Sequence, residues 1–245
     1  MNSLAAFGQL SLVAARALMA GPRLWGRELM RTLARFGTGS LVIAICVAIA
    51  TGAIIVLETA AYTMSFGARD ILGGMASISI LREFGPLMVA LVMSGWVGAS
   101  NTAELGNLTL GGQVSALRGL GADPYEVLVA PRLLGTVLAM ALIALPADFA
   151  AVLGGVAAAR IVLGVEPAMF FHSIDQWVKL RDILEGLLKT VCFGAAIGLL
   201  SSRSGLSTRG GARAVGRSVA TSVVQSVVAV LILDFAITAL VGGRL

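Results

Sequence analysis

Residues 41–57 read LVIAICVAIATGAIIVL and contain no charged side chain. A helix that crosses the hydrocarbon core of a bilayer needs about 20 consecutive, predominantly apolar residues. We extend the run to a predicted membrane span at 40–64, in which Glu58 is the one charged residue. This stretch therefore predicts a protein that is embedded in a membrane.

The rest of the 245-residue chain points to the same fold class. Hydrophobic residues make up 58% of it and charged residues 13%, and its mean hydropathy is +0.93. A soluble domain is about one quarter charged, so this composition argues against a soluble enzyme, a disordered chain and a nucleic-acid-binding module. Four further spans are predicted at 83–100, 133–159, 183–200 and 218–241. We therefore predict one all-α integral membrane domain that fills residues 1–245.

The segment before the first span, residues 1–37, is predicted to contain an amphipathic helix that lies in the membrane interface. Arginines recur every fourth residue at Arg23, Arg27, Arg31 and Arg35, and so drift slowly over one side of a helix. The opposite side carries Trp25, Leu29, Leu33 and Phe36. A basic face opposite an apolar face is typical of interfacial helices. The alternative is an ordinary juxtamembrane helix with a solvated arginine face.

Three connecting segments are predicted from their mixed polarity. Residues 65–82 are expected to form a loop and a semi-apolar return, and 160–181 are mixed. Residues 101–123 form a short amphipathic helix that is too polar to span; it either docks into another protein or lies flat on the membrane. Asp123-Pro124 is a helix start, with Asp as N-cap and Pro at the first helical position, and Asp182 with Glu185 repeats the capping pattern.

The distribution of basic residues predicts the orientation. Eleven of the 18 Lys and Arg residues fall before the first span, in 101–132 or in 201–217. Because cytoplasmic segments carry the excess of basic residues, we predict a cytoplasmic N-terminus and an outer C-terminus.

Enzymatic chemistry is not expected within this chain. Lys189-Thr190 follows Leu187-Leu188 rather than a glycine-rich phosphate loop, and the single histidine, His172, allows neither a metal cluster nor a Ser/His/Asp set. The ionisable residues at membrane depth are Glu58, Asp148, Lys189 and Asp234. Each must face protein or a wet cavity, either as part of a substrate or proton path or as packing and ion-pairing groups.

Arg82 and Glu83 begin the second span on the outer side. Adjacent helical residues point about 100° apart and can serve two surfaces. Arg82 can hold a lipid phosphate, or it can be an interfacial arginine with a nearby acid.

Four groups of residues stand out along the chain by their motifs. The first two are Phe66-Gly67-Ala68 and Leu81-Arg82-Glu83-Phe84-Gly85-Pro86-Leu87. The third is Ala103-Glu104-Leu105-Gly106, then Gln113, Ala116-Leu117, Gly121, Asp123-Pro124 and Pro131-Arg132. The fourth is Thr208, Gly210-Gly211-Ala212, Val215-Gly216-Arg217, Asp234-Phe235 and Thr238. Together they cover about residues 40 to 241, and they resemble the MlaE/YrbE permeases, the membrane subunits of ABC transporters that work with MCE proteins.

The resemblance implies five spans, an N-terminal interfacial helix, and a short cytoplasmic coupling helix at 103–121 between the second and third spans. It also implies a homodimer in the bacterial inner membrane, two cytoplasmic ATPase subunits that bind ATP and Mg, a periplasmic MCE protein and a lipid substrate. Likeness to proteobacterial relatives favours phospholipid as that lipid. No cofactor is expected in this chain. The lipid would lie near Arg82, Glu83, Glu58 and Tyr62. Coupling to the ATPase would involve Glu104, Leu105, Gly106, Gln113, Leu117, Arg118, Asp123 and Pro124.

The chain departs from the family pattern at three places. Gly95-Trp96-Val97-Gly98 lacks an arginine that the family usually has. Gly112-Gln113 and then Ser115 stand where the family usually has Glu-Gln and then Asp in the coupling helix, and Glu58 stands where a glutamine is common. Two alternatives to a lipid-transporting permease therefore stay open: a non-transporting scaffold for an MCE complex, and a proton-coupled secondary transporter.

Overall fold

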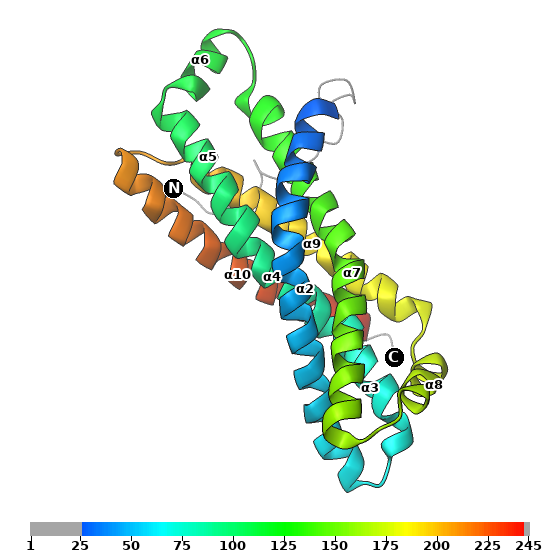
Figure 1. The fold of residues 1–245 in the computed structure, drawn as a ribbon. Coiled ribbons are helices and arrows are strands. Elements are labelled where there is room, and N and C mark those ends of the chain that lie inside the picture. The colour runs from blue at the N-terminus through cyan, green and yellow to red at the C-terminus, as the bar shows by residue number, and fades with distance from the viewer. Residues whose placement is uncertain (1–25, 243–245) are drawn as a thin grey trace. The chain divides into compact units, whose positions relative to one another are not determined.

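The computed structural model describes the backbone of residues 26–242 and the side chains of residues 39–241, and every element in this part of the chain is helical. The elements are α2 (Gly26–Ser65), η1 (Arg69–Ile71), α3 (Leu72–Ser79), η2 (Ile80–Phe84), α4 (Gly85–Met93), η3 (Ser94–Gly98), α5 (Ala99–Leu110), α6 (Gln113–Gly119), η4 (Tyr125–Val129), α7 (Ala130–Leu163), α8 (Pro167–Trp177), α9 (Leu180–Leu206) and α10 (Ala212–Gly242). Figure 1 shows their order along the chain.

Five stretches of the described residues are long and apolar enough to cross a membrane, which confirms the predicted number of spans. They are Gly39–Ser65, Arg69–Leu110, Tyr125–Leu163, Leu180–Leu206 and Ala212–Val241. The predicted interfacial helix falls largely outside the described side chains. Its backbone is helical from Gly26 and continues into the first span without a break, and its interfacial position stays a prediction.

The helices divide into two compact units, and the longest helices run through both. Among the residues whose backbone is described, unit 1 contains 26–38, 93–139 and 192–232, and unit 2 contains 39–92, 140–191 and 233–242. Each unit is therefore built from segments that are far apart in the sequence.

Unit 2 is held together by apolar packing and by small residues that let helices approach closely. Val56, Leu72 and Phe170 belong to one buried cluster. A Cβ at Gly52 in α2 would collide with the carbonyl oxygen of Ala151 in α7. Such small-residue contacts favour helix association inside membranes, where water supplies no hydrophobic driving force.

The segment 65–82, predicted as a loop and a semi-apolar return, is helical from Arg69 onward. α3 packs beside α8 in unit 2, as Figure 1 shows. The Gly74 backbone N–H donates a hydrogen bond of 2.9 Å to Ser173 Oγ, and a Cβ at Gly73 would collide with the Phe170 carbonyl. Glycine lowers helix propensity, so here the close contact with α8 outweighs the local preference.

Unit 1 surrounds a buried polar centre. Asn101 Nδ2 lies 3.4 Å from Thr136 Oγ1 and 3.5 Å from Ser201 Oγ, and Thr102 Oγ1 lies 2.9 Å from Ser222 Oγ. These short side chains come from α5, α7, α9 and α10. Hydroxyl and amide groups that hydrogen-bond between helices stabilise membrane bundles, and their short side chains let the helices pack closely.

Glycines divide the segment predicted to form one helix at 103–121. α5 ends at Leu110 as part of the second span, Gly112 has a positive φ of 74°, and α6 follows. At the other end Gly121 has a φ of 78°, and the N–H groups of Gly121 and Ala122 bond the carbonyls of Arg118 and Leu117. That pattern is a Schellman motif, which ends the helix where the sequence predicts an end.

The two predicted helix starts have different outcomes. Asp123 Oδ1 accepts a 2.9 Å hydrogen bond from the Tyr125 N–H, which confirms its capping role. α9 instead begins at Leu180, two residues before the predicted start. Asp182 lies in its first turn and accepts a 2.7 Å hydrogen bond from the Lys179 N–H. Asp182 thus occupies the third helical position, where its carboxylate accepts from the backbone N–H of the N-cap residue, and it is not the N-cap itself.

Candidate functional site

The polar residues that begin the second span lie on a π-helical turn, η2, which carries Arg82 and Glu83. A π-turn inserts an extra residue into a helix and often occurs at functional sites. Gly186 of α9 contacts this turn so closely that a Cβ there would collide with the Leu81 carbonyl. This approach lets Arg82 and Glu83 reach side chains on α9.

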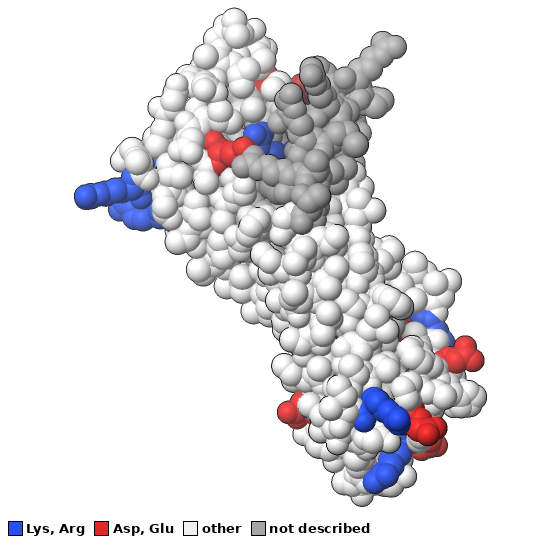
Figure 2. All heavy atoms as spheres, viewed as in Figure 1, with Lys and Arg blue, Asp and Glu red and all other residues white. Residues whose placement is uncertain are grey.

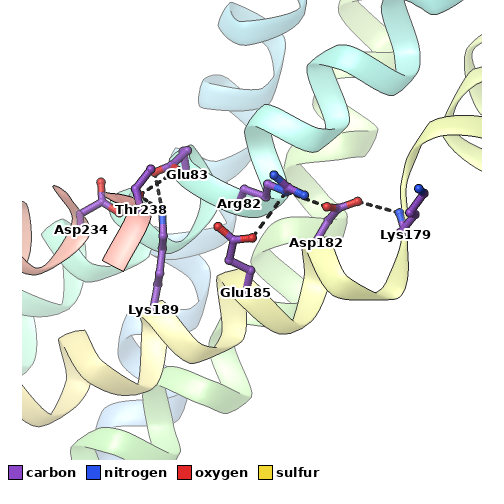
Figure 3. A network of polar contacts seen from close by, with 8 residues as sticks. All are labelled: Arg82, Glu83, Lys179, Asp182, Glu185, Lys189, Asp234 and Thr238. Atoms are coloured by element: carbon purple, nitrogen blue, oxygen red, sulfur yellow. Dashed lines mark hydrogen bonds and ion pairs between the residues drawn. The ribbon is translucent and has the colours of Figure 1, made fainter. Parts of the chain in front are cut away.

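Arg82 is paired with the first two turns of α9. Its Nε atom lies 2.6 Å from Asp182 Oδ1 and 3.7 Å from Glu185 Oε2, and the second distance is an ion pair but too long for a hydrogen bond (Figure 3). Arg82 therefore has acidic partners within its own chain, and its part in lipid binding stays a prediction. Its side chain is still 28% exposed.

Glu83 belongs to a second group around a buried lysine. Lys189 Nζ lies 2.6 Å from Glu83 Oε2, 3.0 Å from Asp234 Oδ1 and 2.7 Å from Thr238 Oγ1. Thr238 donates onward to Glu83 Oε1 at 3.1 Å. Figure 3 shows the lysine reaching from α9 toward η2 and α10, so one cation connects three helices of unit 2.

We call these six ionisable residues the polar cluster: Arg82, Glu83, Asp182, Glu185, Lys189 and Asp234. It contains two cations and four carboxylic groups, so acid outnumbers base. Lys189, Asp182 and Glu185 are buried, whereas Glu83 is 33% exposed. Buried charges in a membrane protein must be paired and commonly mark a substrate or ion path.

Asp148 takes no part in these ion pairs. It packs against Gly85, the residue that follows η2 in the second span. A Cβ at Gly85 would collide with Asp148 Oδ1. Asp148 is buried, and its Oδ1 atom has no hydrogen-bond partner among the described residues. The structure therefore gives Asp148 a packing contact with η2's end rather than an ion pair.

Glu58 and Tyr62, the other predicted lipid contacts, lie one turn apart near the end of the first span in α2. Both side chains are exposed, and Tyr62 is 69% exposed. No hydrogen bond or ion pair within the described part of the chain joins either side chain to the polar cluster. Their role in lipid binding stays a prediction.

The predicted coupling residues divide into a buried and an exposed group. Leu105 and Gly106 are buried on α5, and Cβ atoms at Gly106 and Gly205 would press on Thr208 and Leu105. Pro124 is buried too, and Leu117 and Asp123 are half-buried. The exposed members are Gln113 and Arg118, both on α6. Of the predicted coupling residues with side chains, only these two are fully exposed.

Glu104 is the predicted coupling residue with a charged partner in its own chain. Its Oε2 atom lies 3.6 Å from Arg132 Nη2, and Arg132 Nη1 donates 2.8 Å to the Leu128 carbonyl. Arg132 is buried and Glu104 is 34% exposed. The pair ties α5 to the start of α7 within unit 1.

Residues 29–240 match the family described as Permease MlaE. The chain belongs to the MlaE permease family. It is 31% identical over 239 residues to a probable ABC transporter permease protein of Rickettsia typhi, covering 98% of this chain and 92% of that one. A protein of the same description from Synechocystis is 31% identical over 209 residues, covering 85% and 80%. The chloroplastic protein TRIGALACTOSYLDIACYLGLYCEROL 1 of Arabidopsis thaliana is 28% identical over 212 residues, covering 86% and 61%. This MlaE permease is therefore an ABC transporter membrane subunit.

Sequence reasoning named every ionisable residue of the polar cluster but did not join them. Asp182 and Glu185 were assigned to helix capping, and Lys189 and Asp234 were treated as separate charges. A usable signal was present, because a lysine within an apolar span requires acidic partners. The sequence offered several such acids, and only the fold selects Glu83 and Asp234.

Proposed function

We propose that this chain is the permease subunit of an ABC transporter that moves lipid, specifically phospholipid, between the inner membrane and an MCE-protein channel. Family membership over residues 29–240 is the observation that carries the proposal. The name of the Arabidopsis relative refers to a galactolipid, which supports a lipid as the substrate class. ATP and Mg would be bound by two cytoplasmic ATPase subunits, and this chain would contribute no catalytic residue.

The proposed substrate contacts are Arg82, Glu83, Glu58 and Tyr62. Arg82 and Glu83 are partly exposed while their partners on α9 are buried. A zwitterionic headgroup carries both a phosphate and an ammonium group. The phosphate can pair with Arg82 and the ammonium group can pair with Glu83. Exposed Tyr62 on α2 offers an apolar ring with a polar tip, suited to a lipid interface.

The proposed coupling element is α6 together with Glu104. α6 is bounded by the turns at Gly112 and Gly121, so it can move as a short rigid unit. Its exposed Gln113 and Arg118 would contact the ATPase, and Glu104 would pass movement to α7 through Arg132. We further propose a homodimer in the bacterial inner membrane, with the N-terminus cytoplasmic and the C-terminus periplasmic.

A proton-coupled secondary transporter is the alternative with a structural observation in its favour. Asp148 is buried in a span with one oxygen lacking a hydrogen-bond partner among the described residues. Intramembrane carboxyl groups of this kind serve proton relays in other transporters. Transport driven by a proton gradient without ATP would favour this alternative. A scaffold would assemble with MCE protein but move no lipid.

Gentle purification of the tagged chain from its native membrane, followed by mass spectrometry, tests the proposal. A stoichiometric ATPase, an MCE protein and bound lipid are expected. ATP-dependent lipid transfer by the purified complex, lost in a Gln113→Ala variant that still assembles, would separate the transporter from the scaffold. An intact dimer with no ATPase would refute the energised mechanism.

A further inference from the structure

Unit 1 contains a second polar site that the transport proposal does not use. A cavity of about 380 Å³ opens between the end of α9 and the start of α10. Three of its lining residues are arginines, Arg203, Arg209 and Arg217, and none is acidic. Figure 2 shows basic side chains gathered over the start of α10, which Figure 1 colours orange.

The positive charge of this cavity is not neutralised within the described part of the chain. Arg82 and Arg132 each have a carboxylate partner. Arg203, Arg209 and Arg217 form no ion pair with any acidic side chain of residues 39–241. A cleft lined by one sign of charge concentrates counter-ions. The cavity is therefore complementary to an anion.

The donors around the cavity suit a phosphate group. Guanidinium groups match phosphate oxygens with paired N–H donors, and they are the preferred residues for that recognition. Ser218 and Thr221 add hydroxyl groups at the same wall, and Ser218 Oγ accepts a hydrogen bond from Thr208, which leaves its own proton to donate. A phosphate that carries several acceptor oxygens can use both kinds of donor at once.

The α10 helix indicates that the phosphate belongs to a lipid. Arg217 and Thr221 line the cavity, and Val224, Val228 and Leu231 continue along the same helix face at intervals of three or four residues. All three apolar side chains are exposed. At 1.5 Å per residue, Leu231 lies about 21 Å along the axis from Arg217, close to the length of an extended acyl chain.

We propose that this cavity binds the phosphodiester headgroup of an anionic membrane lipid, with the acyl chains along the exposed face of α10. The site lies in unit 1, whereas the proposed substrate contacts all lie in unit 2. It holds an accessory lipid and does not depend on whether the chain transports one. Failure of either proposal leaves the other standing.

Binding of dioleoyl phosphatidylglycerol to the full chain, purified in uncharged detergent and followed by native mass spectrometry, tests the site. Dioleoyl phosphatidylcholine has the same acyl chains and is the lipid control. The test variant is Arg209→Gln with Arg217→Gln. Arg213→Gln is the matched control, because Arg213 lies between these two arginines in the sequence, in the first turn of α10, is exposed, and does not line the cavity.

The double variant should bind phosphatidylglycerol about 25-fold more weakly, since each arginine near a membrane surface contributes about fivefold. Arg213→Gln should change binding less than twofold. Both the double variant and the control variant should elute in size-exclusion chromatography at the volume of the unsubstituted protein. Equal binding of the two lipids, or equal effects of the test and control variants, would overturn the proposal. Binding of inorganic phosphate without binding of phosphatidylglycerol would also overturn the proposal, and would assign the cavity to free phosphate instead. Lipid bound to the monomer but never to the dimer would show that a second copy covers this face of α10.

Discussion

Lys189→Met is the substitution that most directly tests the polar cluster. Lys189 is fully buried and contacts Glu83, Asp234 and Thr238 at 2.6, 3.0 and 2.7 Å. Methionine keeps much of the side-chain volume but removes the charge, which leaves two acidic groups facing each other. Removing one partner of a buried ion pair costs about 3–5 kcal/mol. We expect a loss of that size in the free energy of unfolding.

The assay is reversible unfolding in mixed micelles of lipid-like and denaturing detergent, followed by tryptophan fluorescence. Lys179→Met is the matched control, because Lys179 is the only other lysine and its side chain is exposed. Exposed substitutions away from special features change stability by less than about 0.5 kcal/mol. A triple variant with Lys189→Met, Glu83→Gln and Asp234→Asn removes the uncompensated charges and should recover at least half of the loss.

Two results would refute this reasoning. The first is an unfolding free energy of Lys189→Met within 1 kcal/mol of that of Lys179→Met, which would mean that the lysine is not a buried ion-pair centre. Alternatively, the triple variant would be no more stable than the single one. In that case the cost would come from packing rather than from unpaired charge.

Three further predictions concern other contacts. Gly85→Ala should lower the free energy of unfolding by about 1–3 kcal/mol, because the added methyl group meets the Asp148 carboxyl. Thermal unfolding should show a smaller loss when the same change is made in an Asp148→Ala background, and an equal loss would contradict the contact. Gly121→Ala should cost about 1 kcal/mol in the same assay, since φ is 78° at the end of α6, and no change would mean that the turn relaxes freely. Glu104→Gln should cost about 1 kcal/mol or less, because its 3.6 Å pair with Arg132 is about one third exposed. ATP-driven lipid transfer by that variant should fall severalfold, and unchanged transfer would remove Glu104 from the coupling path.

Residue order alone was enough to predict how many spans the chain has. Uncharged runs such as 41–57 leave few alternatives, because backbone groups in lipid must be satisfied within a helix. Local capping was predictable at Asp123 and Gly121, since both act on residues within a few positions. The family resemblance rested on motifs that occur in a fixed order, and the match of residues 29–240 to the MlaE permease family confirms it.

Contacts between distant segments were beyond the sequence. Residues 65–82 were predicted as a short loop followed by a semi-apolar return, but packing against α8 makes residues 69–79 helical. Asp182 looked like an N-cap, yet its second oxygen pairs with Arg82, one hundred residues away. The sequence by itself determined a five-span helical membrane protein, because hydropathy and capping are local properties. Only the tertiary structure decided which buried acids meet Lys189 and Arg82, because a charge in a span requires a partner but does not specify which one.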